Sequence, residues 1–249
     1  MSEIDPSTEE TLSPVPNSVE VWDLGVRLFH WALVALVITA VVTVKIGGNA
    51  IPYHSYCGYA ILTLVLFRIL WGFAGGTNAR FTSFVTGPGQ VMAYLKTMFK
   101  RDHGSVEGGS HAHNPGTYGH NPMGALSVLA MLAALLFQAV SGLFVNDDIL
   151  FEGPLYAWVG KDLSDKITGW HKFNEKIIIL LVVTHIAAIL FYFFYKKDNL
   201  ISPLISGVRK VTGKVPAMRA GSPVMAAVLL GISALAVYLL VNAIKLFGK

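Results

Sequence analysis

Long apolar stretches alternate with polar segments along this chain of 249 residues. Five stretches approach the roughly 20 residues that a helix needs to span a bilayer, and they lie at about 26–45, 55–73, 124–145, 174–195 and 224–247. Because hydrocarbon offers no hydrogen-bond partner to the backbone, such stretches must fold as helices. The pattern predicts an all-α integral membrane protein, a four-helix transmembrane bundle followed by a fifth, C-terminal transmembrane helix.

The segments between and beside these stretches divide the chain further. Residues 1–20 are acidic and rich in Pro and Ser without a basic leader, so we expect a disordered tail. The main transmembrane domain is predicted at 21–200, with an amphipathic interfacial piece at 87–101 and a mobile Gly- and His-rich loop at 102–121. A short interfacial helix is expected within 147–170, and residues 201–249 form a linker and the fifth helix.

The composition agrees with a membrane protein. Apolar residues make up 53% of the chain and charged residues 14%, whereas soluble domains carry about 25% charged residues. The net charge of +4 does not indicate a nucleic-acid partner, because the basic residues lie in particular loops. The single cysteine, Cys57, excludes a disulfide framework and a four-thiolate iron–sulfur cluster, and no Cys-x-x-Cys-His motif is present for covalent haem attachment.

The loop charges predict an orientation. With five helices, the N-terminus and the loops 74–123 and 196–223 share one side of the membrane, and that side carries Arg80, Lys96, Lys100, Arg101, Lys196, Lys197, Arg209, Lys210, Lys214 and Arg219. The loop 146–170 on the other side carries five acids against two lysines: Asp147, Asp148, Glu152, Asp162 and Asp165 against Lys161 and Lys166. The positive-inside rule places the N-terminus in the cytoplasm.

Four histidines in the apolar stretches are the strongest candidates for chemistry. His171 and His185 lie fourteen residues apart, about 21 Å along a helix and on one face. His30 and His54 lie at the starts of the first two stretches. When each helix is followed from the side on which it enters the membrane, His30 is placed at the same depth as His185. His54 lies at the depth of His171.

Each depth-matched pair can hold one iron through two neutral imidazoles, which predicts two haems stacked across the bilayer. A lone histidine at a helix end is more often an interfacial or hydrogen-bonded residue, so the prediction depends on the spacing and the pairing. Ionisable residues inside a membrane are costly and usually functional. The remaining histidines lie in the polar loop and are interpreted as solvated: His103, His111, His113 and His120. The alternative is a weak surface metal site that involves His111 and His113.

Small and basic residues supply further candidates for cofactor contacts. Gly58 lies one turn after His54, and Gly124 and Gly142 share a face, so a porphyrin could cross the backbone there; ordinary close helix packing is the alternative. Basic side chains near the helix ends could pair with haem propionates, or extend to lipid headgroups instead: Arg27, Arg68, Lys45 and Lys172.

Several segments together resemble the prokaryotic cytochrome b561 family, which includes the cytochrome b subunits of nickel–iron hydrogenases. They are WDLGVRLFHW, FRILWGF, ARFTSFVTGP, GHNPMGALSVLAMLAALLFQAVSGLF and WHKFNEKIIILLVVTHIAAIL, and they cover about 20–200. The resemblance implies a bacterial inner-membrane cytochrome with two bis-histidine haem b groups that exchanges electrons between quinone and a redox partner. It carries the ligand roles to His30, His54, His171 and His185.

The function that follows is electron transfer across the bilayer between the quinone pool and a periplasmic c-type cytochrome or oxidoreductase subunit. One alternative is a membrane anchor and relay subunit of a periplasmic enzyme such as a hydrogenase. Another is a stand-alone superoxide or quinone oxidoreductase, and a haem-free transporter is the most distant. The acidic loop could dock a basic partner or be ordinary solvated surface. The sequence leaves undecided whether the protein forms a homodimer and whether it is itself an enzyme.

Overall fold

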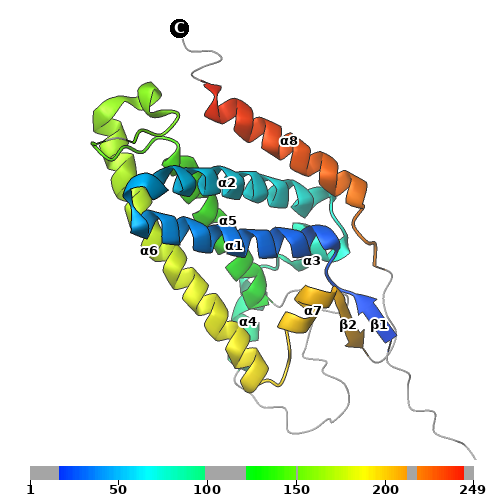
Figure 1. Cartoon of the computed structure of the whole chain (residues 1–249). Coiled ribbons are helices and arrows are strands. Elements are labelled where there is room, and N and C mark those ends of the chain that lie inside the picture. Colours follow the sequence, from blue (N-terminus) through cyan, green and yellow to red (C-terminus); the bar gives the residue numbers. More distant parts are fainter. Residues whose placement is uncertain (1–16, 99–121, 150, 212–217, 244–249) are drawn as a thin grey trace, which may run out of the picture.

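The structure is a computed structural model that describes residues 17–98, 122–149, 151–211 and 218–243. Within these ranges, five helices are long and apolar enough to cross a membrane. They are α1 (Leu24–Ile46), α2 (Ile51–Ala74), α5 (Pro122–Gly142), α6 (Tyr156–Phe194) and α8 (Pro223–Val241). The predicted all-α membrane architecture is therefore confirmed (Figure 1).

Shorter elements gather near the two ends of the bundle. Strands β1 (Asn17–Glu20) and β2 (Val208–Val211) pair antiparallel beside α7 (Ile201–Ser206), and we call this end the strand side. The same side carries η2 (Thr77–Ala79), α3 (Phe81–Phe84) and α4 (Pro88–Met98). The opposite end, the loop side, carries η1 (Gly48–Ala50) and the segment 143–155.

The helix ends follow local chemistry. The Asp23 carboxylate accepts the Val26 N–H at 2.8 Å and begins α1, while Gly47, with φ of 69°, ends it in a conformation that side chains disfavour. Ser222 caps α8 directly before Pro223. These caps lie within a few residues of the boundaries expected from hydropathy.

Three expectations about segments need correction or fall outside the structure. The predicted tail is wrong for Asn17–Glu20, because β2, distant in sequence, supplies the strand partner. The expected interfacial helix in 147–170 is instead the first part of α6, which begins at Tyr156 and is interrupted only at Gly160 (φ 68°). The His-rich loop 102–121, the first sixteen residues and the predicted end of the fifth helix at 247 lie outside the described residues.

The predicted interfacial piece at 87–101 is helical as α4 over Pro88–Met98. The hydroxyls of Tyr94 on α4 and Tyr192 on α6 hydrogen-bond to each other, which attaches α4 to the bundle. Burial raises the pKa of the Tyr94 hydroxyl, so this side chain is neutral at physiological pH.

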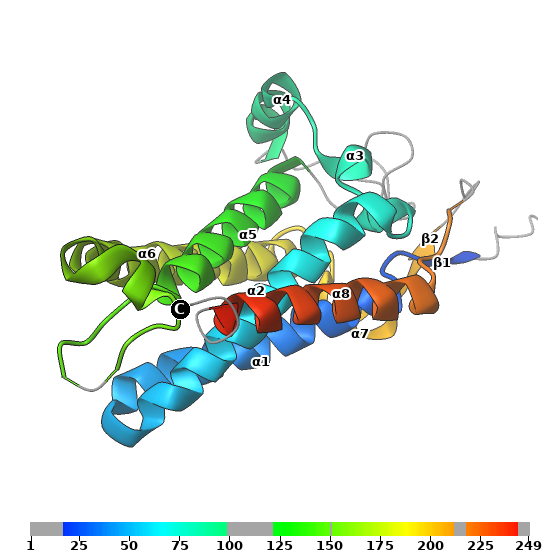
Figure 2. The same ribbon diagram turned by 90° about the horizontal axis from the view of Figure 1, so that it is seen from above.

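Helix α2 is the centre of the bundle and packs against α1, α5 and α8, whereas α6 packs mainly against α5 (Figure 2). Its side chains Leu62, Val65 and Trp71 are almost completely buried. Much of the apolar surface of α1 and α6 is exposed, as expected for helices in contact with lipid. The predicted histidines lie on α1, α2 and α6 around this core.

A buried polar cluster joins α1 to the strand-side end of α2. The indole N–H of Trp71 donates to the Asp23 carboxylate at 3.1 Å, and both side chains are buried. Asn78 donates to the Val21 carbonyl at 3.1 Å from the segment that follows α2. The polar positions of the WDLG and LWGF segments therefore serve to fix the helix ends.

Candidate functional site

The loop-side histidines lie side by side. His54 is in the first turn of α2 and His171 is in α6, and their ring centroids are 6.3 Å apart with planes at 83°. Both side chains are partly buried. The structure thus brings together two residues separated by 117 positions (171 minus 54), as depth matching predicts.

The tautomer of His54 follows from its partner. Its Nδ1 lies 2.8 Å from the Ala40 carbonyl oxygen on α1. A carbonyl oxygen can only accept, so Nδ1 carries the proton and Nε2 keeps its lone pair. Metal-binding histidines are commonly held in this way, with one ring nitrogen donating to a backbone carbonyl and the other free to coordinate.

A chain of hydrogen bonds fixes the tautomer of His171 as well. The Asn174 amide donates to the Ala134 carbonyl at 2.9 Å and to Gln138 Oε1 at 2.8 Å. The Gln138 amide nitrogen must then face His171 Nε2, 3.0 Å away, and donate to it. His171 Nδ1 consequently carries the proton and donates to Ser141 Oγ at 3.0 Å.

Both loop-side imidazoles therefore present an Nε2 lone pair, the form in which histidine binds a metal ion. Metal–imidazole bonds are roughly 2 Å long, so ring centroids 6.3 Å apart suit one metal ion between the two rings. Gln138 donates to the lone pair of His171 and would have to turn away for coordination. Among the described residues there is no cluster of three or more His, Cys, Asp or Glu side chains, which leaves the histidine pairs as metal-site candidates.

The strand-side histidines also lie near each other. His30 on α1 and His185 on α6 are coupled electrostatically across the two helices. The Nδ1 atom of His30 is buried and, within the described residues, has no hydrogen-bond partner. An unpartnered buried nitrogen is costly in an apolar setting, so hydrogen bonding at Nδ1 does not explain a histidine at this position.

The predicted glycines occupy different surroundings. A Cβ on Gly142 would lie 3.2 Å from Cε1 of His171, so this glycine makes room for the imidazole. A Cβ on Gly58 would meet nothing within 4 Å, which leaves open space on that face of α2. Gly124 is partly buried in the first turn of α5. The cofactor role of these three glycines stays a prediction.

The predicted basic residues have partners within the protein or lie at the surface. Arg68 is 3% exposed, donates to the Ala79 carbonyl at 3.0 Å and lies over the Phe81 ring. Arg27 donates to the Ile205 carbonyl, although its buried Nε has no partner within the described ranges. Lys172 is exposed, and Lys45 pairs with Glu175 at 2.8 Å. Propionate contact stays a prediction for these residues.

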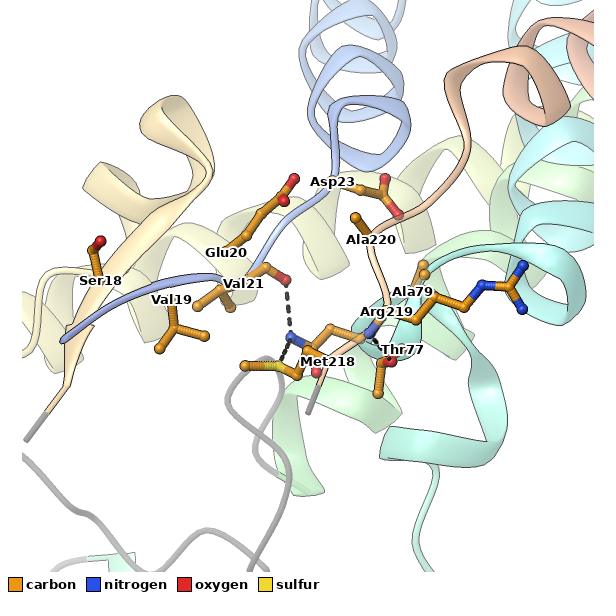
Figure 3. A pocket seen from close by; sticks show the side chains of 12 residues that line it. Ser18, Val19, Glu20, Val21, Asp23, Thr77, Ala79, Met218, Arg219 and Ala220 are labelled. Carbon is orange, nitrogen blue, oxygen red and sulfur yellow. Dashed lines mark hydrogen bonds between the residues drawn. The ribbon is translucent and has the colours of Figure 1, made fainter. Parts of the chain in front are cut away.

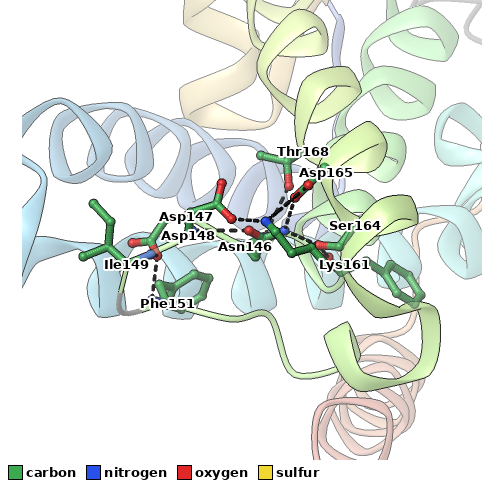
Figure 4. A network of polar contacts seen from close by, with 10 residues as sticks. Asn146, Asp147, Asp148, Ile149, Phe151, Lys161, Ser164, Asp165 and Thr168 are labelled. Carbon is green, nitrogen blue, oxygen red and sulfur yellow. Dashed lines mark hydrogen bonds and ion pairs between the residues drawn. The ribbon is translucent and has the colours of Figure 1, made fainter.

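The acidic loop is an ordered polar network (Figure 4). Lys161 pairs with both Asp148 and Asp165, and Asn146 donates to Ser164 and Asp165 at 2.7 and 2.9 Å. The Asp147 carboxylate accepts backbone N–H groups of the turn that follows it. Three of the five acids thus serve the loop itself, which favours a structural role over a docking surface.

A pocket of about 220 Å³ opens on the strand side between β1, η2 and the segment 218–220 (Figure 3). The Thr77 hydroxyl accepts the Arg219 N–H at 2.9 Å at its edge. None of the four intramembrane histidines lines this pocket.

Sequence reasoning missed the residues that orient His171. Gln138, Ser141 and Asn174 are polar residues inside apolar helices, and this is the signal that could have found them. Gln138 and Ser141 are three apart on α5, so they share a face. Only the packing of α5 against α6 shows that this face meets His171.

The fold and the site define a class: an all-α membrane protein whose helices present paired, neutral imidazoles. Comparison with known families agrees, because a family model described as prokaryotic cytochrome b561 matches residues 21–207. No curated protein and no solved structure matched the chain.

The chain belongs to the prokaryotic cytochrome b561 family. It is a multi-pass membrane electron-transfer protein, and its family implies haem b as the cofactor and indicates the inner membrane.

Proposed function

We propose that the protein is a di-haem cytochrome b that carries electrons across the membrane between quinone and a periplasmic redox partner. His54 and His171 would hold one haem on the loop side, and His30 and His185 the other on the strand side. The observation that carries the proposal is the loop-side pair, in which two adjacent imidazoles both carry the proton on Nδ1 and the lone pair on Nε2, although Gln138 now donates to Nε2 of His171. Haem b supplies the one-electron chemistry when bound, and the chain supplies ligands, depth and surroundings.

The two pairs would divide the bilayer between them. His171 and His185 are on the same uninterrupted part of α6, which fixes their separation along one helix. The loop-side pair would face the periplasm and a donor or acceptor protein there. The strand-side pair would face the cytoplasm and exchange electrons with quinone. This orientation follows from the basic loops on the strand side.

Haem content tests the proposal. Purified protein should contain two b-type haems per chain in a pyridine haemochrome assay. Before pyridine is added, the protein should show the low-spin signal of bis-histidine haem. The matched control replaces three loop histidines together, His111, His113 and His120, with Ala, and it should retain both haems. A haem-free protein without a Soret band, as a transporter would be, or one haem per chain would contradict the proposal.

The anchor-subunit alternative shares this cofactor content and differs by requiring a stable partner. Extraction in mild detergent followed by affinity purification should therefore leave the cytochrome without a stoichiometric periplasmic subunit if it acts with a transient partner. Stoichiometric co-purification of such a subunit would favour the anchor.

A further inference from the structure

The strongest unassigned feature is the hydrogen-bond chain from Asn174 through Gln138 and His171 to Ser141. Ser141 is 6% exposed and lies one residue before the end of α5. Its Oγ is 3.0 Å from His171 Nδ1 and 3.1 Å from the Gln138 backbone carbonyl. The hydroxyl proton is directed to that carbonyl, so the oxygen accepts the imidazole proton, and both bonding roles of the side chain are used.

Resting on the proposed haem ligation by His171, we propose that Ser141 is a positioning residue that sets the tautomer and donor strength of this ligand. An acceptor at Nδ1 holds the proton there, keeps Nε2 available and makes the imidazole a stronger electron donor. A stronger donor stabilises the oxidised, more positive iron. Ser141 should therefore lower the midpoint potential of the loop-side haem relative to a ligand without this partner.

The other residues of this hydrogen-bond chain determine which group donates and which accepts at each step. Asn174 uses both amide hydrogens, one on the Ala134 carbonyl and one on Gln138 Oε1, which prevents the Gln138 amide from presenting its oxygen to His171. The adjacent Gly142 leaves the space that the ring occupies, because a Cβ would lie 3.2 Å from Cε1. The ring is thus held at both nitrogens and along one edge. Ligation through Nε2 would displace the Gln138 amide and leave Ser141 and Gly142 to orient the ring.

The two loop-side ligands then differ in the strength of their acceptors. His54 donates to a backbone carbonyl at 2.8 Å, and His171 donates to a hydroxyl at 3.0 Å. Removing the hydroxyl leaves His54 and its partner unchanged. The effect of Ser141 should therefore be confined to one haem and should arise through one of its two ligands.

The test is a potentiometric titration of the purified cytochrome, with wild type, Ser141→Ala and Ser141→Thr compared. Ser141→Ala should raise the potential of the loop-side haem, alter its low-spin electron paramagnetic resonance signal and leave the other haem unchanged. Ser141→Thr retains the hydroxyl and should restore the wild-type potential. The matched control is Ser233→Ala, because Ser233 is 1% exposed and its hydroxyl also bonds to a carbonyl of its own helix, at 2.9 Å.

The outcomes separate this inference from the proposed function. Two haems with unmoved potentials in Ser141→Ala would overturn the positioning role while leaving the di-haem assignment intact. A wild type with fewer than two haems would instead overturn the di-haem assignment. Loss of the loop-side haem in Ser141→Ala with recovery in Ser141→Thr supports the inference, whereas loss in both variants would assign Ser141 to packing alone.

Discussion

At the scale of single residues, the loop-side site shows how a membrane protein can hold two neutral imidazoles in one tautomer. The Ala40 carbonyl fixes His54, and the Ser141–Gln138 pair fixes His171. An unpaired ring nitrogen would be costly in hydrocarbon, so each contact both stabilises the bundle and prepares the ligand. If the proposed ligation holds, the same atoms serve folding and electron transfer.

Gly142 gives a prediction at this scale. Gly142→Ala places a Cβ 3.2 Å from His171 Cε1, closer than a relaxed contact, so the imidazole must shift by a few tenths of an ångström. The loop-side haem should show a changed low-spin spectrum and a shifted potential while the strand-side haem keeps its own. Gly169→Ala on α6 is the matched control, since its Cβ meets nothing within 4 Å. Equal spectra for the two variants would show that Gly142 is not required for the ring.

The histidines could be found from the sequence, whereas the polar residues of α5 could be found there only as candidates and not as partners of His171. Periodicity places His171 and His185 on one face of one helix, and the side from which that helix enters the membrane gives the depth of each histidine. Ser141 and Gln138 depend on how α5 is rotated against α6, which hydropathy does not determine. The sequence predicts that Arg68 contacts a haem propionate or extends to lipid headgroups, but it does not predict the hydrogen bond that Arg68 donates to the Ala79 carbonyl.

At the scale of elements, the boundaries of the helices depend on polar residues that hydropathy treats as interruptions. Helix α6 already includes residues 161–173, before the apolar stretch begins, because lysine forms helices nearly as well as leucine does. Hydropathy does not predict strand β1, because its partner β2 is distant in sequence and pairs Asn17 with Val211, 194 positions away (211 minus 17). The extension of α6 is a local preference that hydropathy does not record, whereas the strand pair depends on a distant partner.

Asp23 gives the prediction for elements. Asp23→Ala removes the cap of α1 and leaves the buried Trp71 indole N–H unpaired, which together should cost about 2–4 kcal/mol of stability. Asp23→Asn keeps an acceptor for both groups and should retain most of it. Thermal unfolding in detergent, followed by helical circular dichroism, measures the difference.

The exposed neighbour Glu20 provides the control, and Glu20→Ala should melt like the wild type. If Asp23→Ala also melted like the wild type, the cluster of Asp23 and Trp71 would not hold the ends of α1 and α2 together.

At the scale of the whole molecule, five spans and the charge of the loops predict the side of the membrane on which each proposed haem would lie. The strand side has the basic residues, so we expect it in the cytoplasm. Alkaline phosphatase fused after Asp148 should be active, and the same reporter fused after Asp198 should be inactive. The reverse pattern would exchange the sides of the two proposed haems and place the quinone site at the periplasm.

The most direct test of the central claim is selective ligand loss followed by redox titration. His54→Ala and His171→Ala should each remove the same haem signal, and His30→Ala and His185→Ala should each remove the other, because each pair shares one iron. The four variants should therefore give two complementary spectra, one from each pair. If His54→Ala and His185→Ala instead lost the same signal, the pairing would be wrong and the proposed path across the membrane with it.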